Sequence, residues 1–291
     1  MKKKLLTGLA LIFSFILIAC GSSDSTIKVG SKDFTESLVI SEIYALALED
    51  NGYEVERVQN IASSVIPQSL ESGEIDLYPE YTGTSLITIF NLPLETDPDA
   101  VAETIRSEYE AIDLTTLDYA PANNAQGIAI RTDVAEDLGI TTISDLQANA
   151  DQIRFASQGE FDLREDGLIG LAEVYGEFNF ADSTVYDNSL KYQILRNDEA
   201  DATPAYTTDG QLVNEDEFLV LEDDQNFWPP YNLVPVLRQE VLDENPEIED
   251  LINEINADLT TEMVIELNAE VDIEGREYQV VAEEYYNSIN E

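Results

Sequence analysis

The chain of 291 residues carries 60 acidic and 14 basic side chains, a net charge of −46, with one cysteine and no histidine. This charge excludes nucleic acid and anionic lipid surfaces as binding partners, and the lack of histidine excludes a histidine-based catalytic triad. The excess of acid is typical of a protein adapted to high salt, where a short Debye length screens the repulsion, and 44% hydrophobic residues allow a buried core. No phosphate-binding or calcium-binding loop is present, so we expect no cofactor and no metal.

The N-terminus has the layout of a secretory signal. Lysines at positions 2–4 precede an uncharged segment over residues 5–19, which is shorter than the ~20 apolar residues that a spanning helix needs. The order Leu17-Ile18-Ala19-Cys20 resembles a bacterial lipobox, in which the cysteine is lipidated. We therefore expect a signal peptide over residues 1–19, a lipid on Cys20, a tether over residues 20–25, and anchoring on the extracytoplasmic face of the cell membrane. A single spanning helix with an incidental cysteine is the alternative.

Apolar spacing and capping signals then predict alternating strands and helices. The first strand covers residues 26–30, and a capping-box-like start over Asp33 to Glu36 opens a helix that runs to about residue 49. The other expected elements are strand 75–77, a helix after Gly83, a helix opened by Asp97 and Pro98, strand 127–131, helices 134–138 and 144–150, strand 153–156, and a mostly helical tail from residue 245 with a break near residues 272–275. The alternation predicts an α/β fold of parallel sheets flanked by helices, and the length favours two lobes.

Ligands of open α/β sheets bind beyond the carboxyl ends of the strands. Tyrosines and the rare basic residues of this chain gather at such places. They lie in residues 30–32, 78–84, 160–164, 204–209 and 228–231. We expect these segments to form the walls of a binding site.

These segments also carry motifs of a known family. The chain reads Val29-Gly-Ser-Lys-Asp-Phe-Thr-Glu36, Tyr78-Pro-Glu-Tyr-Thr-Gly-Thr84, Pro204-Ala-Tyr-Thr-Thr-Asp209 and Pro229-Pro-Tyr231. In this order and spacing they resemble the substrate-binding proteins of ABC importers for glycine betaine, choline and related quaternary amines, from about residue 27 to the C-terminus. The resemblance implies a two-lobed type II periplasmic-binding-protein fold, a monomer that delivers its ligand to a membrane permease, and no enzymatic activity.

The resemblance further implies how the chain divides. The first lobe is expected over residues 26–121 and 216–291, and the second lobe over residues 122–215. The segments near Asn123 and Asp216 would then be the hinges on which the lobes close.

A quaternary amine explains the residue types at these motifs. A trimethylammonium group has no N–H to donate and is recognised by aromatic faces, each contributing about 0.5 to 2 kcal/mol, whereas a betaine carboxylate needs hydrogen-bond donors. The resemblance implies a cage of Tyr81, Tyr206 and Tyr231 and carboxylate donors at Lys32, Thr84 and Arg164. The alternatives are that each tyrosine packs in the core or on the surface, that Lys32 is solvated, and that Arg164 pairs with Glu165 or Asp166.

One segment departs from the family pattern. Where the family commonly has an aspartate followed two residues later by a cage tyrosine, this chain has Asn124 and Gln126. A fourth cage wall is then missing, unless Trp228, Phe161 or Tyr119 supplies it. The ligand expected first is glycine betaine or proline betaine. Choline, carnitine or ergothioneine is the alternative ligand, and a secreted hydrolase with paired carboxylates is the remote alternative function.

Overall fold

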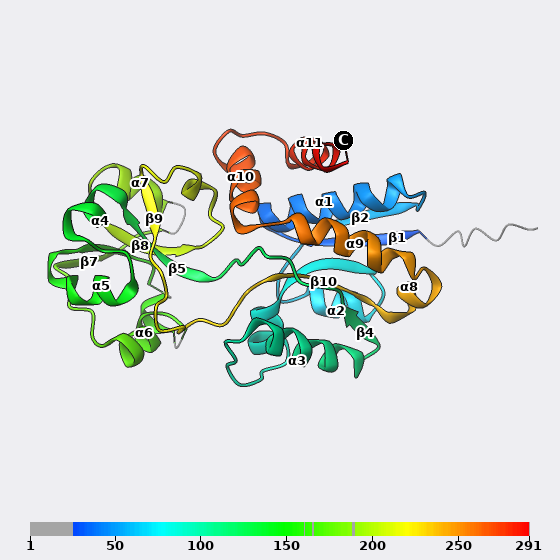
Figure 1. Cartoon of the computed structure of the whole chain (residues 1–291), viewed down its shortest axis with the longest axis horizontal. Coiled ribbons are helices and arrows are strands. Elements are labelled where there is room, and N and C mark those ends of the chain that lie inside the picture. Colours follow the sequence, from blue (N-terminus) through cyan, green and yellow to red (C-terminus); the bar gives the residue numbers. More distant parts are fainter. Residues whose placement is uncertain (1–25, 160, 165, 188–189, 291) are drawn as a thin grey trace, which may run out of the picture.

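Two lobes, each built on one five-stranded sheet, make up the computed structural model (Figure 1). The structure describes residues 26–159, 161–164, 166–187 and 190–290. The expected signal peptide, Cys20 and the whole of the tether lie outside these residues. Within the described ranges, no helix is both long enough and apolar enough to cross a bilayer.

The sheet of the first lobe is mixed. Its strands, in order across the sheet, are β2 (Val55–Ile61), β1 (Ile27–Lys32), β3 (Leu77–Tyr81), β10 (Leu233–Arg238) and β4 (Leu114–Thr116). Strand β1 pairs in parallel with β2 and β3, whereas β10 runs antiparallel to both β3 and β4.

The sheet of the second lobe repeats this plan. Its strands, in order, are β7 (Asp182–Val185), β6 (Arg154–Ser157), β8 (Ala202–Tyr206), β5 (Gln126–Arg131) and β9 (Phe218–Val220). Strand β6 is parallel to β7 and β8, and β5 is antiparallel to β8 and β9. The expectation of parallel sheets was therefore wrong for β10 and β5, the strands that follow the two passages of the chain between the lobes.

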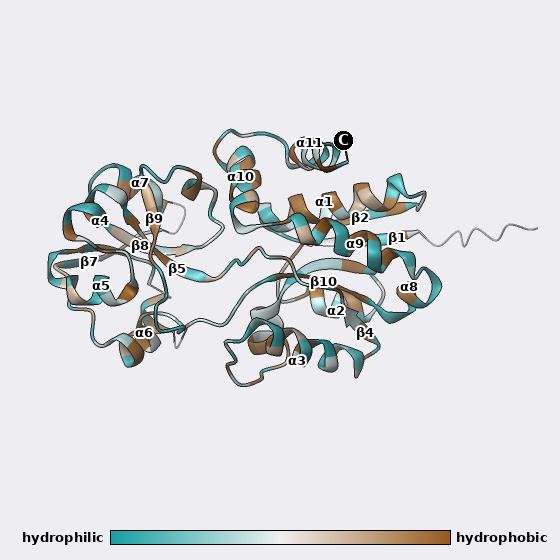
Figure 2. Ribbon diagram, viewed as in Figure 1, coloured by the Kyte–Doolittle hydropathy of each residue, from teal (hydrophilic) through white to brown (hydrophobic). Residues whose placement is uncertain are grey.

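Helices cover the faces of both sheets (Figure 1). Those of the first lobe are α1 (Thr35–Asp50), α2 (Ile66–Glu71), α3 (Pro98–Glu110), α8 (Gln239–Glu244), α9 (Glu247–Asp258), α10 (Thr261–Asp272) and α11 (Tyr278–Ile289), and those of the second lobe are α4 (Thr132–Leu138), α5 (Ile143–Ala148), α6 (Leu168–Tyr175) and α7 (Lys191–Arg196). Helix α1 packs between the sheet and helices α9, α10 and α11, and it is buried on nearly all sides because it is apolar almost all round. Hydrophilic residues dominate the outer helices α8 and α9 (Figure 2).

Two local expectations differ from the structure. Helix α1 begins at Thr35 after Phe34, and no side chain caps it, so the capping box over Asp33 and Glu36 does not form. The Glu36 carboxylate instead accepts the Tyr81 hydroxyl. The strand expected at residues 75–77 begins only at Leu77 and extends to Tyr81 as β3, where β10 pairs with it over its whole length.

Sheet membership places the second passage later than expected. Strand β9 pairs with β5, and Leu221 and Trp228 pack in the core of the second lobe. The chain therefore returns to the first lobe over residues 229–232, after Trp228 and before β10, not near Asp216, and Asn123 lies in the first passage. The two passages are hydrogen-bonded side by side: the Tyr231 N–H donates to Asn123 Oδ1 at 2.8 Å.

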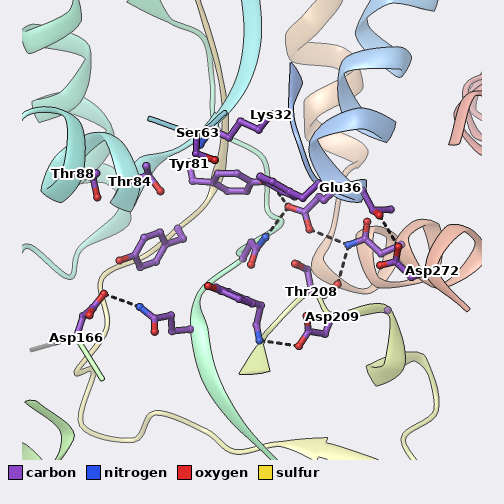
Figure 3. A pocket seen from close by; sticks show the side chains of 18 of the residues that line it. Lys32, Glu36, Ser63, Tyr81, Thr84, Thr88, Asp166, Thr208, Asp209 and Asp272 are labelled. Atoms are coloured by element: carbon purple, nitrogen blue, oxygen red, sulfur yellow. Dashed lines mark hydrogen bonds between the residues drawn. The ribbon is translucent and has the colours of Figure 1, made fainter. Parts of the chain in front are cut away.

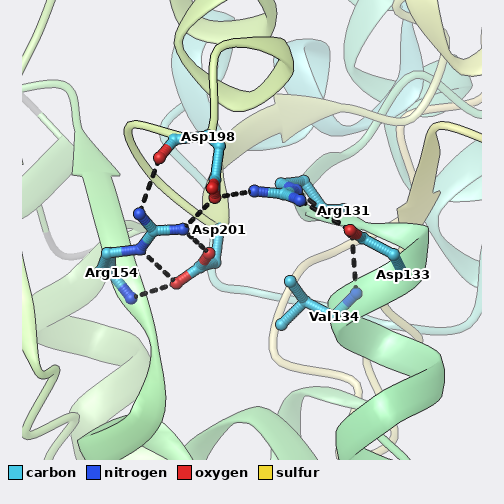
Figure 4. A network of polar contacts seen from close by, with 6 residues as sticks. All are labelled: Arg131, Asp133, Val134, Arg154, Asp198 and Asp201. Carbon is cyan, nitrogen blue, oxygen red and sulfur yellow. Dashed lines mark hydrogen bonds and ion pairs between the residues drawn. The ribbon is translucent and has the colours of Figure 1, made fainter.

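The arginines of the second lobe tie its strands together. Arg154, at the start of β6, donates from Nε to Asp201 at 3.0 Å and also pairs with Asp198. Arg131, at the end of β5, pairs with Asp198 and with Asp133 (Figure 4). Basic residues are scarce in this chain, and each of these two arginines pairs with two carboxylates.

Candidate functional site

A cavity of about 610 Å³ lies between the two lobes. Its wall is formed by the ends of β1 and β3, the start of α1, the π-helical turn Thr84–Ile89 and, from the second lobe, segments around residues 164–166 and 206–210. The strand ends are where open α/β sheets bind ligands, and the volume is within the range of small-molecule sites.

The residues that sequence analysis assigned to ligand binding all line this cavity. Lobe one contributes Lys32, Tyr81 and Thr84, lobe two contributes Gln126, Arg164 and Tyr206, and the two passages contribute Asn124 and Tyr231. Their proximity is a structural fact. Their contact with a ligand stays a prediction.

Phe34 is an aromatic wall that the sequence analysis missed. Its ring stacks on Tyr81 with the ring centroids 6.2 Å apart and the planes 29° apart, and both rings line the cavity. In the described part of the chain, Trp228, Phe161 and Tyr119 do not line it: the first two pack in the core of lobe two and Tyr119 packs against lobe one. The signal for Phe34 was its place directly beyond strand β1.

Tyr231 is held by close packing against the turn at Gly83. A Cβ added at Gly83 would lie 2.8 Å from ring carbons Cδ1 and Cε1 of Tyr231 and 2.8 Å from the Pro230 carbonyl oxygen. Glycine at this position therefore lets the ring sit where it does. Burial, with a smaller contribution from the nearby Asp166 carboxylate, raises the pKa of Tyr231 to about 12, so its hydroxyl is protonated at neutral pH.

Tyr206, a residue that is 46% exposed, lines the cavity from the second lobe. Asp209 fixes its backbone by accepting the Tyr206 N–H at 3.0 Å. The same carboxylate accepts Lys191 Nζ at 2.6 Å and the Tyr192 hydroxyl at 2.8 Å. The Lys191 ammonium thereby lies 5.5 Å from the centroid of the Tyr206 ring.

Lys32 is buried and ion-paired. Its ammonium donates to Glu80, and the two side chains are almost inaccessible to solvent. Glu80 also accepts the Tyr78 hydroxyl at 3.0 Å and the Tyr81 N–H at 2.9 Å. The Lys32 ammonium lies 5.1 Å from the centroid of the Tyr81 ring, so the alternative of a solvated lysine was wrong.

Arg164 pairs with Asp166, one of the alternatives that the sequence left open. Nε donates to Asp166 Oδ1 at 2.6 Å and Nη2 donates to Oδ2. Gln126 Nε2 donates to the same carboxylate at 2.8 Å. The hydrogen bond from Arg164, opposed by partial burial, holds the pKa of Asp166 below its usual value.

Glu36 is a second residue that the sequence analysis missed as a part of the site. Only 5% of it is exposed, and it lies against Tyr81 at the cavity wall (Figure 3). Oε1 accepts the Tyr81 hydroxyl at 2.6 Å and Asn124 Nδ2 at 3.1 Å, and Oε2 accepts Asn268 Nδ2 at 3.0 Å. Burial and this carboxylate raise the pKa of Tyr81 well above its usual value. The Asn124 amide therefore donates to a carboxylate of the protein itself.

Comparison with known proteins places the fold and the site in context. Residues 25–288 match the family described as the substrate binding domain of the ABC-type glycine betaine transport system. A glycine-betaine-binding protein of Pseudomonas aeruginosa is 34% identical over 292 residues, which cover 97% of this chain and 94% of that relative. A carnitine transport binding protein, OpuCC, of Listeria monocytogenes is 29% identical over 304 residues, covering 100% of this chain and 98% of the relative.

A solved structure agrees with the architecture. The crystal structure of a glycine betaine/carnitine/choline ABC transporter protein superimposes with a TM-score of 0.86 at 27% identity, covering 91% of this chain and 98% of the other. The expected two-lobed type II periplasmic-binding-protein fold is thereby confirmed.

Proposed function

This chain belongs to the family of substrate-binding domains of ABC-type glycine betaine transport systems, and we propose on that basis that it captures a zwitterionic quaternary amine, glycine betaine or proline betaine, between its lobes. The family consists of extracytoplasmic transport proteins and not of enzymes, so the hydrolase alternative is set aside. The partner that receives the ligand is an ABC permease.

The observation that carries the ligand proposal is the set of aromatic rings on the cavity wall. Tyr81 and Phe34 come from lobe one, Tyr231 from the second passage and Tyr206 from lobe two. A trimethylammonium group between such rings gains cation–π attraction that water cannot replace. Closure of the lobes brings Tyr206 toward the other rings and desolvates the cation.

The carboxylate of the ligand is assigned mainly to Arg164. Because Lys32 is already paired with Glu80, its role in this proposal is to balance that buried charge. Arg164 uses Nε and Nη2 for Asp166, which leaves Nη1 as the donor for a ligand. Thr84, at the start of the π-helical turn, and Gln126 supply neutral polar groups beside it.

Closure is proposed to turn on the two hydrogen-bonded passages, residues 123–125 and 229–232, which lie between the residues packed in the two cores. The permease then recognises the closed pair of lobes, with the protein acting as a monomer. A lipid on Cys20 would keep the protein at the membrane. The check is that a Cys20→Ser chain appears in the medium or soluble fraction, whereas the parent chain remains with the membrane.

Calorimetric titration of residues 26–291 at about 1 M salt tests the ligand proposal. The panel is glycine betaine, proline betaine, choline, carnitine and ergothioneine. Tyr231→Ala should weaken betaine binding by about tenfold or more, the loss expected for a desolvated cage ring. Tyr53→Ala is the matched control, because Tyr53 is a half-buried tyrosine outside the cavity whose hydroxyl donates to Glu247 at 2.7 Å. Equal affinities of the parent and Tyr231→Ala chains would contradict the cage.

A second candidate is the same receptor role for choline or carnitine. The ion pairs of Lys32 and Arg164 already occupy the basic groups of the cavity wall, which favours choline because it has no carboxylate. Binding of choline with glycine betaine silent would select this candidate. Binding of ergothioneine alone would indicate that the cavity, with the polar Gln126 in its wall, takes a larger ligand.

A further inference from the structure

The charged side chains of the cavity wall divide into paired and unpaired groups. The paired groups are Lys32 with Glu80, Arg164 with Asp166, and Asp209 with Lys191. Among the residues that the structure describes, Glu36 and Asp272 also line the cavity, and their partners are neutral side chains. The wall therefore has an excess of negative charge on the side formed by α1 and α10.

Glu36 is the more buried of these two carboxylates, and hydrogen-bond donors without charge surround it. It lies in the first turn of the long helix α1, where the helix dipole favours negative charge. The Tyr81 hydroxyl and the amides of Asn124 and Asn268 donate to it. These donors stabilise the carboxylate without neutralising it.

We propose that Glu36 gives the site its preference for a positively charged ligand group and that it acts through Tyr81. The 2.6 Å hydrogen bond from the phenol to the carboxylate increases electron density on the ring, and the negative charge beyond the hydroxyl adds to the attraction that a cation over the ring experiences. A neutral group of the same shape gains neither effect. This inference rests on the proposed function.

Lys32 does not cancel this effect. Its ammonium lies 5.1 Å from the centroid of the Tyr81 ring, but the paired Glu80 balances its charge. The negative charge of Glu36 is therefore the unbalanced charge that acts on a cation over the Tyr81 ring. Glu36 is a positioning residue, because it sets the charge preference through another side chain.

The same arrangement orients a zwitterionic ligand. A helix N-terminus beside a binding site ordinarily attracts an anionic group. At α1 that position is already taken by Glu36, so a ligand carboxylate is repelled from lobe one. It is directed to lobe two, where Arg164 lies.

The test compares two probes that differ only in charge: glycine betaine and its tert-butyl isostere, tert-butylacetate, in which carbon replaces the ammonium nitrogen. The quantity measured by calorimetry is the ratio of their affinities. Glu36→Gln should lower this ratio by about tenfold or more while affinity for the isostere changes little. The substitution is accommodated because Asn124 Oδ1 is buried without a hydrogen-bond partner among described residues, so rotation of the Asn124 amide supplies an acceptor, whereas Asn268 keeps its bond to the Thr208 carbonyl.

Glu42→Gln is the matched control. Glu42 is a buried carboxylate of the same helix, but it pairs with Arg57 outside the cavity, so the ratio should equal that of the parent chain. If Glu36→Gln does not fold, Tyr81→Phe decides, because it keeps the ring and deletes the link to Glu36. The expected result is again a lower ratio.

The outcomes separate the inference from the proposed function. A parent chain that binds neither probe overturns the proposed function, and the inference falls with it. A parent chain that binds glycine betaine, together with an unchanged ratio in folded Glu36→Gln or in Tyr81→Phe when that chain is the deciding one, overturns the inference alone.

Discussion

Replacement of Lys32 by methionine distinguishes a structural role from a ligand-binding role for this lysine. Lys32 is 3% exposed, and its ammonium donates to Glu80, which is fully buried. Removing one partner of a buried ion pair costs about 3–5 kcal/mol, because the other charge stays buried without a counter-ion. The Tyr78 hydroxyl and the Tyr81 N–H still donate to Glu80, so we expect the lower end of that range.

The double variant Lys32→Met/Glu80→Gln isolates the cause. It removes both charges and keeps an oxygen that accepts from Tyr78 or Tyr81. Replacing a buried pair by neutral groups is often nearly neutral for stability, so the double variant should recover most of the loss. The free energy of unfolding is measured by urea titration at about 1 M salt, followed by far-ultraviolet circular dichroism.

Ligand affinity, measured on the same variants, distinguishes the structural role of Lys32 from a role in ligand binding. If Lys32 only balances Glu80, the double variant should bind betaine within about threefold of the parent chain, well below the loss expected for a deleted charged hydrogen bond. A Lys32→Met chain of unchanged stability, whose binding is lost and is not restored in the double variant, would refute the structural role. Lys32 would then be a direct donor to the ligand.

The remaining predictions concern packing, pH and salt. Gly83→Ala introduces a Cβ 2.8 Å from the Tyr231 ring at an ordinary φ of −66°; it should cost about 1–3 kcal/mol of stability through overpacking and weaken ligand binding, and retention of both properties would show that the ring moves freely. Affinity should be constant between about pH 6 and pH 9, because the chain has no histidine and the pKa of Tyr231 is raised to about 12. A change of ligand affinity with pH within that interval, measured by calorimetry, would contradict this prediction. The free energy of unfolding should rise with salt up to molar concentrations, because salt screens the acidic surface; a flat dependence would remove the argument for adaptation to high salt.

Local pattern predicted the elements that depend on near neighbours in the chain. Strand β1, helix α1 and the helix capped by Asp97 were predicted close to their observed bounds, since the Asp97 side chain accepts the Ala100 N–H as expected. Strand β10 was not predicted as a strand, and β5 was not predicted to be antiparallel. Their direction and pairing are set by the way in which the chain crosses between the lobes.

The candidate site divides in the same way. The motif around Tyr81 and the motif around Tyr231 predicted which residues meet, because the order of strands fixes which strand ends share an edge. The partners of the charged residues were not predictable. Glu80 is two residues from Tyr78 in the sequence, but its ion pair with Lys32 crosses from β3 to β1.

The sequence by itself determined the class of fold, the segments that line the cavity between the lobes and the acidic character of the chain, because these follow from composition, local propensity and motif order. Only the tertiary structure decided how the charges of the cavity are used. Whether a buried carboxylate such as Glu36 meets a cation or neutral donors depends on which side chains from distant segments reach it. Asn124 and Asn268 come from segments 88 and 232 residues away, and no local pattern encodes that meeting.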